Sequence, residues 1–137
     1  MSETYTEITL KNTVDVENAE NGLIKQSDVR QTTVQALVDT GSTELVISEK
    51  IRRKLGLRIV KDCVVELANN QTETCHEAGP VAVHWKDRET FCSAVVMPGE
   101  GEVLLGAIPM ESLDITVNLL RQEVTGAHGN KKLFKAK

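Results

Sequence analysis

The apolar residues of this chain occur in short runs, and most of these runs alternate with polar residues at the period of two that is typical of β-strands. The runs occupy residues 4–13, 29–38, 45–47, 63–68, 71–75, 81–85, 91–97 and 103–105. Turn-forming residues, among them Asn69-Asn70 and Pro98-Gly99, stand between several of the runs. The polar stretch 14–22 ends in Asn-Gly, and we expect it to form a hairpin or a loop. The pattern therefore predicts an all-β chain.

Two pairs of these runs are expected to form hairpins. Residues 63–68 and 71–75 flank Asn69-Asn70, and asparagine tolerates the left-handed conformation that a tight turn requires. Residues 81–85 and 91–97 are read as two further strands, and the charged residues 86–89 are expected to form the turn between them.

Two short segments have helical rather than strand character. Ser48 has the chemistry of a helix N-cap, and Gly56 can close the same helix. Between them, Ile51 and Leu55 lie four residues apart, on one helical face. A short helical turn, started by Pro109, is expected over residues 108–113. The fold class is thus all-β with one or two short helices.

Length and composition favour one domain. The chain has 137 residues, 40% hydrophobic and 26% charged, which fits a single compact domain over residues 1–137. Within it we expect an N-terminal strand and loop over 1–28 and a loose basic tail over 126–137. A chain this short leaves much of its surface in water, so a large cleft is expected to need a second copy.

Charge and composition exclude several classes of partner and site. The formal net charge is −4 and aromatic residues make up only 3%, which argues against nucleic-acid binding. The N-terminus lacks a signal-peptide pattern and no apolar run reaches the roughly 20 residues needed to span a bilayer, so we expect a cytoplasmic protein without membrane contact. Three widely spaced cysteines match no zinc pattern, and we expect free thiols, no metal and no cofactor.

The stretch ALVDTGSTELVIS, residues 36–48, carries the candidate chemistry. Asp39 follows a buried strand directly, which places one carboxylate where the strand ends. Gly41 allows the backbone to turn sharply and its N–H to approach the acid, and Thr40 and Ser42 add two hydroxyls. An ordinary Asx turn, in which Asp39 accepts local amide protons, would explain the same four residues.

The wider pattern resembles the retropepsin-like aspartic proteases, in particular their small bacterial single-domain members. The resemblance rests on Asp39 to Ser42 after an apolar strand, a helix ending in Leu-Gly-Leu, the polar-tipped hairpin, and Leu104-Leu105-Gly106 placed 65 residues beyond Asp39. It extends from about the second strand to Asn118. It implies an all-β acid protease barrel with one or two short helices, acting as a homodimer because one chain supplies one Asp-Thr-Gly.

The resemblance also implies a role for each motif residue. Asp39 would be the catalytic residue, and the two copies in a dimer would share one proton. Thr40 would bond to the opposite subunit, Gly41 would let substrate approach, and Ser42 would donate to the carboxylate and favour activity at acid pH. The remaining roles go to the flap, a hairpin that closes over substrate, and to the support behind the loop: Ala68, Asn69, Asn70 and Gln71 for the flap, and Leu104, Leu105 and Gly106 for the support.

Other polar residues receive a structural interpretation. Asp114 is the second acid of interest, and we expect a turn or a helix end there. His76, His84 and His128 have no nucleophile or metal ligands around them in the sequence and are interpreted as incidental.

Two functions fit the sequence. The first is an aspartic endopeptidase whose partners are a peptide or protein substrate and a second copy of the chain. The second is a retropepsin-fold dimer that binds peptides or partners without cutting them, because fold alone does not determine function.

Overall fold

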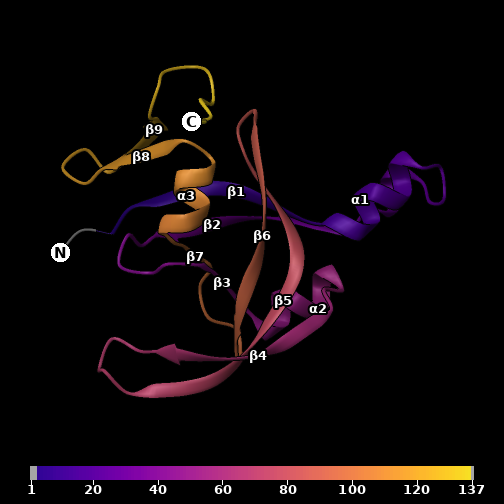
Figure 1. Ribbon diagram of the computed structural model, residues 1–137, viewed down its shortest axis with the longest axis horizontal. Helices are drawn as coiled ribbons and strands as arrows, with labels where there is room; N and C mark the ends of the chain where they lie inside the picture. Colours follow the sequence, from indigo (N-terminus) through magenta and orange to yellow (C-terminus); the bar gives the residue numbers. More distant parts are fainter. Residues whose placement is uncertain (1–2, 137) are drawn as a thin grey trace.

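The computed structural model describes residues 3–136 and contains nine strands and four helical segments over that range (Figure 1). The strands are β1 (Tyr5–Asn12), β2 (Gln31–Val38), β3 (Leu45–Ser48), β4 (Ile59–Glu66), β5 (Thr72–Trp85), β6 (Arg88–Met97), β7 (Leu104–Leu105), β8 (Ile115–Asn118) and β9 (Glu123–Gly126). The helical segments are α1 (Thr13–Glu20), the 3-10 turn η1 (Gln26–Asp28), α2 (Glu49–Leu55) and α3 (Ala107–Ser112).

Six of the strands close into a barrel. Their order is β1-β2-β7-β3-β6-β5, and β5 returns to pair with β1, so that Leu10 lies opposite Val83. The fourth strand, β4, is added outside the ring on the edge of β5. Figure 1 shows the long strands β5 and β6 running side by side through the height of the molecule. The predicted all-β barrel with a few short helices is confirmed.

The core is built from the alternate positions of these strands. Every second residue of a strand points to the same side of its sheet, and the inward positions are apolar. Burying one aliphatic side chain of this size contributes about 1.5–3 kcal/mol. The buried strand residues include Ile8, Leu10, Ala36, Val38, Leu45, Ile47, Val81, Val83, Ala94, Val96 and Leu105.

The prediction of a hairpin or loop over residues 14–22 is wrong, because residues 13–20 form helix α1. The helix begins at buried Asn12, whose side-chain oxygen accepts a hydrogen bond from the Asp15 backbone N–H at 3.1 Å. The Asn12 amide also donates to the carbonyl oxygen of Leu55, at 2.9 Å, and to that of Gly56. One capping residue therefore starts α1 and ties it to the end of α2.

Helix α2 is confirmed with its predicted ends. Ser48 Oγ accepts a hydrogen bond from the Ile51 backbone N–H at 3.2 Å, and Gly56 ends the helix in the left-handed conformation with φ of 63°. Leu55 is fully buried, as the spacing of its apolar face requires. Helix α3 covers most of the predicted helical turn and begins at Ala107, two residues before Pro109.

Two details of the predicted hairpins are wrong. Residues 72–75 and 81–85 belong to one 14-residue strand, β5, which passes through a register irregularity between Ala78 and Val81. The turn after it contains only Lys86 and Asp87, because Arg88 and Glu89 already belong to β6.

Arg88 is 4% exposed, which is unusual for a charged residue. Its guanidinium donates to the carbonyl oxygens of Leu113, Asp114 and Gly129, the last at 2.6 Å. The buried charge is accommodated because the backbone supplies these acceptors. Arg88 thus fastens the C-terminal segment to the barrel.

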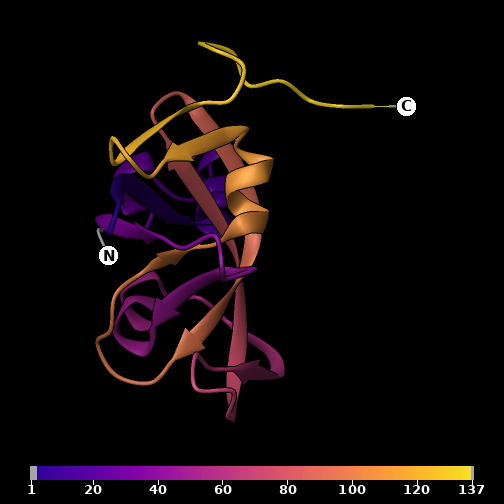
Figure 2. The same cartoon turned by 90° about the vertical axis from the view of Figure 1, so that its left-hand side faces the viewer.

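The C-terminal region has more structure than the sequence indicates. Strands β8 and β9 form a separate antiparallel hairpin that the apolar pattern does not predict. Beyond the hairpin, the Leu133 N–H and His128 Nδ1 donate hydrogen bonds to the carboxylate of Asp114, which precedes β8, each at 2.9 Å. Residues 128–133 are therefore tied down within the predicted loose tail, and Figure 2 shows the chain end leading away from the barrel. Among residues 3–136, no helix has the length and apolar character to cross a bilayer.

Candidate active site

The Asp-Thr-Gly-Ser segment forms the loop between β2 and β3 (Figure 1). Strand β2 ends at Val38, and the Asp39 backbone N–H donates to the carbonyl oxygen of Leu105 at 3.1 Å. The Ser42 N–H then donates to the Asp39 carbonyl oxygen at 3.1 Å, which closes a turn. The barrel thus holds both the start of the loop and the position of its acid.

Both oxygens of the Asp39 carboxylate have a donor. The Gly41 backbone N–H donates to Oδ1 at 3.0 Å, and the Ser42 hydroxyl donates to Oδ2 at 3.1 Å. These two contacts fix the orientation of a half-buried carboxylate. The contact with Gly41 is also that of an Asx turn, so the function of the acid depends on what surrounds it.

Strand β7 and Gly106 support the loop from behind. Leu104 pairs with β2 and β3, and Leu105 is fully buried. After them, the N–H groups of Ala107 and Ile108 donate to the carbonyl oxygens of Ser42 and Thr43 at 2.8 and 2.9 Å. A Cβ on Gly106 would lie 2.3 Å from the Glu44 carbonyl oxygen, so only glycine permits this approach.

The loop opens into a cleft of about 460 Å³. It is lined by the loop, by strand β4 and by residues of β3, β5 and β6, which we call its floor. β4 pairs only with β5 in the described sheet, so its other backbone edge is unpaired beside the cleft. The lining residues are Gly41, Ser42, Thr43, Glu44, Val46, Cys63, Val64, Val65, Glu66, Glu77, Ser93, Ala94 and Val95.

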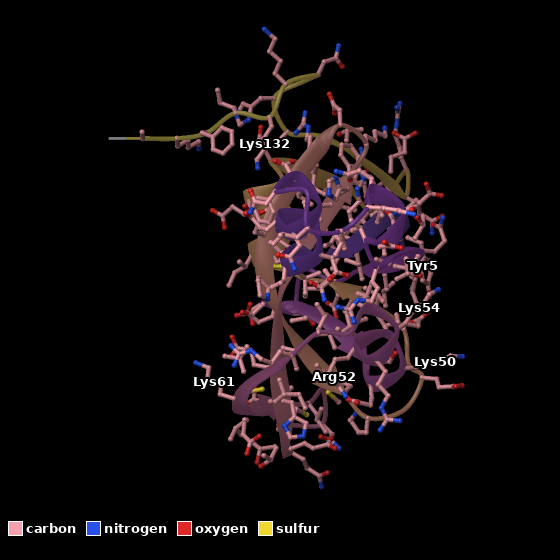
Figure 3. The ribbon with its side chains drawn as sticks, turned by 90° about the vertical axis from the view of Figure 1, so that its right-hand side faces the viewer. Tyr5, Lys50, Arg52, Lys54, Lys61 and Lys132 are labelled. Atoms are coloured by element: carbon pink, nitrogen blue, oxygen red, sulfur yellow. The ribbon has the colours of Figure 1, made fainter. Side chains whose placement is uncertain are left out.

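The cleft has a mixed polar and apolar lining, and its charged residues are acidic. Its lining includes three glutamates and neither lysine nor arginine. One of them, Glu77, forms an ion pair with Lys61 at 3.6 Å. Figure 3 shows Lys61 on the opposite edge of the molecule from Lys50 and Lys54. Burial, aided by the charge of Glu44, raises the pKa of the Cys92 thiol beside the cleft to about 11.

The hairpin tip at residues 68–71 has the predicted turn geometry. Asn70 adopts φ of 66°, and its N–H donates to the Leu67 carbonyl oxygen at 2.9 Å. Asn69 Oδ1 accepts from the Gln71 N–H at 3.0 Å. The four tip residues are exposed and do not line the cleft; the stem of the hairpin, residues 63–66, does.

Comparison with known families agrees with this geometry. The family model described as "gag-polyprotein putative aspartyl protease" matches residues 26–114, which is more than half of the chain. The chain belongs to this family of retropepsin-like aspartic proteases. A comparison with curated proteins finds no match. The matched part of the retropepsin-like chain contains the Asp39 loop, the β4–β5 hairpin, β7 and α3; helix α1 and the β8–β9 hairpin lie outside it.

Several residues that shape the cleft have no signal in the sequence. The floor residues Glu77, Ser93 and Val95 occupy outward positions of β5 and β6, and they meet only because these strands pair. The second acid and the histidines named in the sequence analysis do not line the cleft. Asp114 contacts His128 and Leu133, His76 contacts Asp62, and His84 contacts Glu89. Asp39 and Thr40 are not among the residues that line the cleft, and Thr40 is exposed.

Proposed function

We propose that this protein is an aspartic endopeptidase whose active site forms between two copies of the chain, each supplying one Asp39. The observation that carries the proposal is the Asp39 carboxylate itself. It is held by Gly41 and Ser42 in a loop that opens into a cleft bounded by a hairpin. Membership of the retropepsin-like family supports the same chemistry.

Peptide hydrolysis would follow from two such carboxylates placed close together. Two carboxylates about 3 Å apart cannot both ionise cheaply, so they share one proton; aspartic proteases are the standard example of this behaviour. The ionised Asp39 would act as general base on a bound water, and the protonated one would donate to the scissile carbonyl oxygen. No covalent intermediate and no cofactor are required.

The surrounding residues would have supporting roles. Thr40, which is exposed in the single chain, would bond across the two-fold axis to the loop of the other subunit. The β4–β5 hairpin, with Ala68, Asn69, Asn70 and Gln71 at its tip, would act as the flap that closes over substrate and excludes water. The unpaired edge of β4 beside the cleft suits an extended peptide, which can add to a sheet edge as a strand. The three free cysteines are typical of a reducing compartment and support a cytoplasmic location.

The test is digestion of a peptide library from acidic to neutral pH by the wild type and by Asp39→Asn. Replacing the general base should lower the cleavage rate by about 10²- to 10⁴-fold. Asp87→Asn, at an exposed turn position of the same charge, is the matched control and should cleave normally. Undiminished cleavage by Asp39→Asn would contradict the proposal. Absence of cleavage by the wild type at every pH would favour the alternative, a peptide-binding module with the same fold.

A further inference from the structure

Two of the three cysteines face each other in the stem of the β4–β5 hairpin, where the two strands pair. Cys63 on β4 and Cys75 on β5 are direct register partners in the antiparallel pair. Side chains of directly opposed residues lie on the same face of a sheet, with Cα atoms about 4.5–5.5 Å apart. Disulfides form at Cα separations of about 4.4–6.8 Å. The backbone of the hairpin therefore already holds these two thiols at a separation that a disulfide can bridge.

Both thiols are free, and their surroundings favour the protonated form over the thiolate. Burial raises the pKa of Cys75, and the charges of Glu73 and of Cys63 itself add to this effect. Burial, with Glu77 and Asp62, raises the pKa of Cys63 as well. Both cysteines are therefore protonated thiols, and each must lose its proton before it can act as a nucleophile.

An oxidant can reach one of the two sulfurs. Cys75 is only 3% exposed, whereas Cys63 is half-buried and lines the cleft of about 460 Å³. A small disulfide that enters the cleft therefore meets Cys63 first. Cys92, the third cysteine, lies on β6. Its register partner is Val81 of β5, so it has no thiol across from it.

We propose that Cys63 and Cys75 form a redox-active dithiol site that reacts with a low-molecular-weight disulfide of the glutathione class. The Cys63 thiol loses its proton to solvent, and the thiolate attacks one sulfur of the small disulfide, which releases one small thiol. Cys75 then also loses its proton to solvent, and its thiolate attacks the Cys63 sulfur and releases the second small thiol. The protein loses two hydrogen atoms and two electrons, and the reagent gains them as two thiols.

The product would change the hairpin rather than the barrel. A bond between Cys63 and Cys75 fastens β4, whose other edge is unpaired, to β5 and closes residues 64–74 into a loop. The stem that forms one wall of the cleft would then open less readily. A reducing environment would break the Cys63–Cys75 bond and let the stem move as before.

The experiment exposes the purified full chain, without oxygen, to excess oxidised glutathione, and then alkylates the remaining thiols. The oxidised protein should be lighter by two hydrogen atoms, carry one alkylated cysteine instead of three, and yield a peptide that links Cys63 to Cys75. Cys92→Ser is the matched control and should oxidise in the same way. Cys63→Ser and Cys75→Ser should not form the intramolecular bond.

Other outcomes would overturn the proposal: three alkylatable thiols after oxidation, a glutathione adduct that never resolves, or a disulfide only between molecules. Circular dichroism of each variant shows whether it has folded, and Ala in place of Ser at Cys75 provides a second variant if the buried hydroxyl disturbs the hairpin. The readout requires no peptidase activity, so it is independent of the function proposed for Asp39.

Discussion

At the scale of single residues, the Ser42 hydroxyl is the contact most open to a direct test. It donates to Asp39 Oδ2 at 3.1 Å, and such a bond favours the ionised carboxylate. In a pair of acids that shares one proton, removing the bond makes ionisation harder. Ser42→Ala should therefore shift both limbs of a bell-shaped pH–rate profile to higher pH.

The measurement is the pH dependence of cleavage of one peptide by both proteins. Ser93→Ala is the matched control, because Ser93 also lines the cleft but forms no hydrogen bond with Asp39 within the described residues. An optimum that stays in place, or becomes more acidic, in Ser42→Ala would show that this hydroxyl does not act on the catalytic pair.

Gly106 gives a second prediction at this scale. In Gly106→Ala the new methyl group would lie 2.3 Å from the carbonyl oxygen of Glu44 and 2.8 Å from that of Ser42, both backbone atoms that cannot swing aside. We expect a loss of about 1–3 kcal/mol in the free energy of unfolding, together with reduced cleavage because the Asp39 loop is displaced.

Gly101→Ala is the comparison, since a Cβ there meets nothing within 4 Å. Urea unfolding of the two variants measures the difference in stability. Equal stability of both would mean that the contact between Gly106 and the loop is looser than the structure indicates.

At the scale of elements, Asp114 connects the C-terminal segment to the end of α3. The Leu133 N–H and the His128 ring donate to its carboxylate and lower the pKa of Asp114 below its usual range. A carboxyl group with a lowered pKa in the folded state stabilises that state above its usual pKa, and the contribution is lost as the pH falls through the folded value. Residues 128–133 should therefore detach in strong acid before the barrel unfolds.

The amide proton resonance of Leu133, followed by NMR from neutral to strongly acidic pH, reports this titration. Its midpoint should lie below the pKa of an ordinary aspartate, and Asp114→Asn should abolish the titration while the barrel resonances stay unchanged. A midpoint at or above the ordinary value would contradict the role assigned to Asp114.

The elements also show what the sequence could and could not predict. The period-two runs located the strands of the barrel, and Ser48 with Gly56 located α2, because these signals are local. Helix α1 lacks an apolar stripe; it depends on Asn12, whose amide reaches Leu55. The charge of Arg88 predicts a turn, whereas the carbonyl oxygens that accept its hydrogen bonds lie 25 to 41 residues away in the chain.

In the candidate site, too, local contacts could be predicted from the sequence and contacts between distant segments could not. Asp39, Gly41 and Ser42 are neighbours in sequence, so their mutual contacts could be anticipated from the residues alone. The cleft could not, because its lining comes from the loop and from four strands, β3, β4, β5 and β6. Its outward-facing residues, such as Glu77 and Val95, look like ordinary exposed strand positions until the sheet brings them together.

At the scale of the whole molecule, one chain offers one Asp39, and the proposed site needs two. Specific activity should therefore fall on dilution, in step with dissociation of the dimer, because the active fraction depends on protomer concentration. Cleavage rate and sedimentation should be measured over the same concentration series. A monomer in sedimentation that still cleaves would exclude the shared site, whereas constant activity into the nanomolar range with an intact dimer would mean a tight association.

The irregularity in β5 has one more consequence for the whole molecule. Before Ala78 this strand pairs with the edge strand β4, and after Val81 it is enclosed between β1 and β6 in the barrel. Local opening costs little where the neighbouring strand is free to leave, and it costs the full unfolding free energy inside a closed sheet. Native-state hydrogen exchange should therefore be fast at residues 72–75 and slow at residues 81–85. One continuous strand would thus contain both the most and the least protected amides of the sheet.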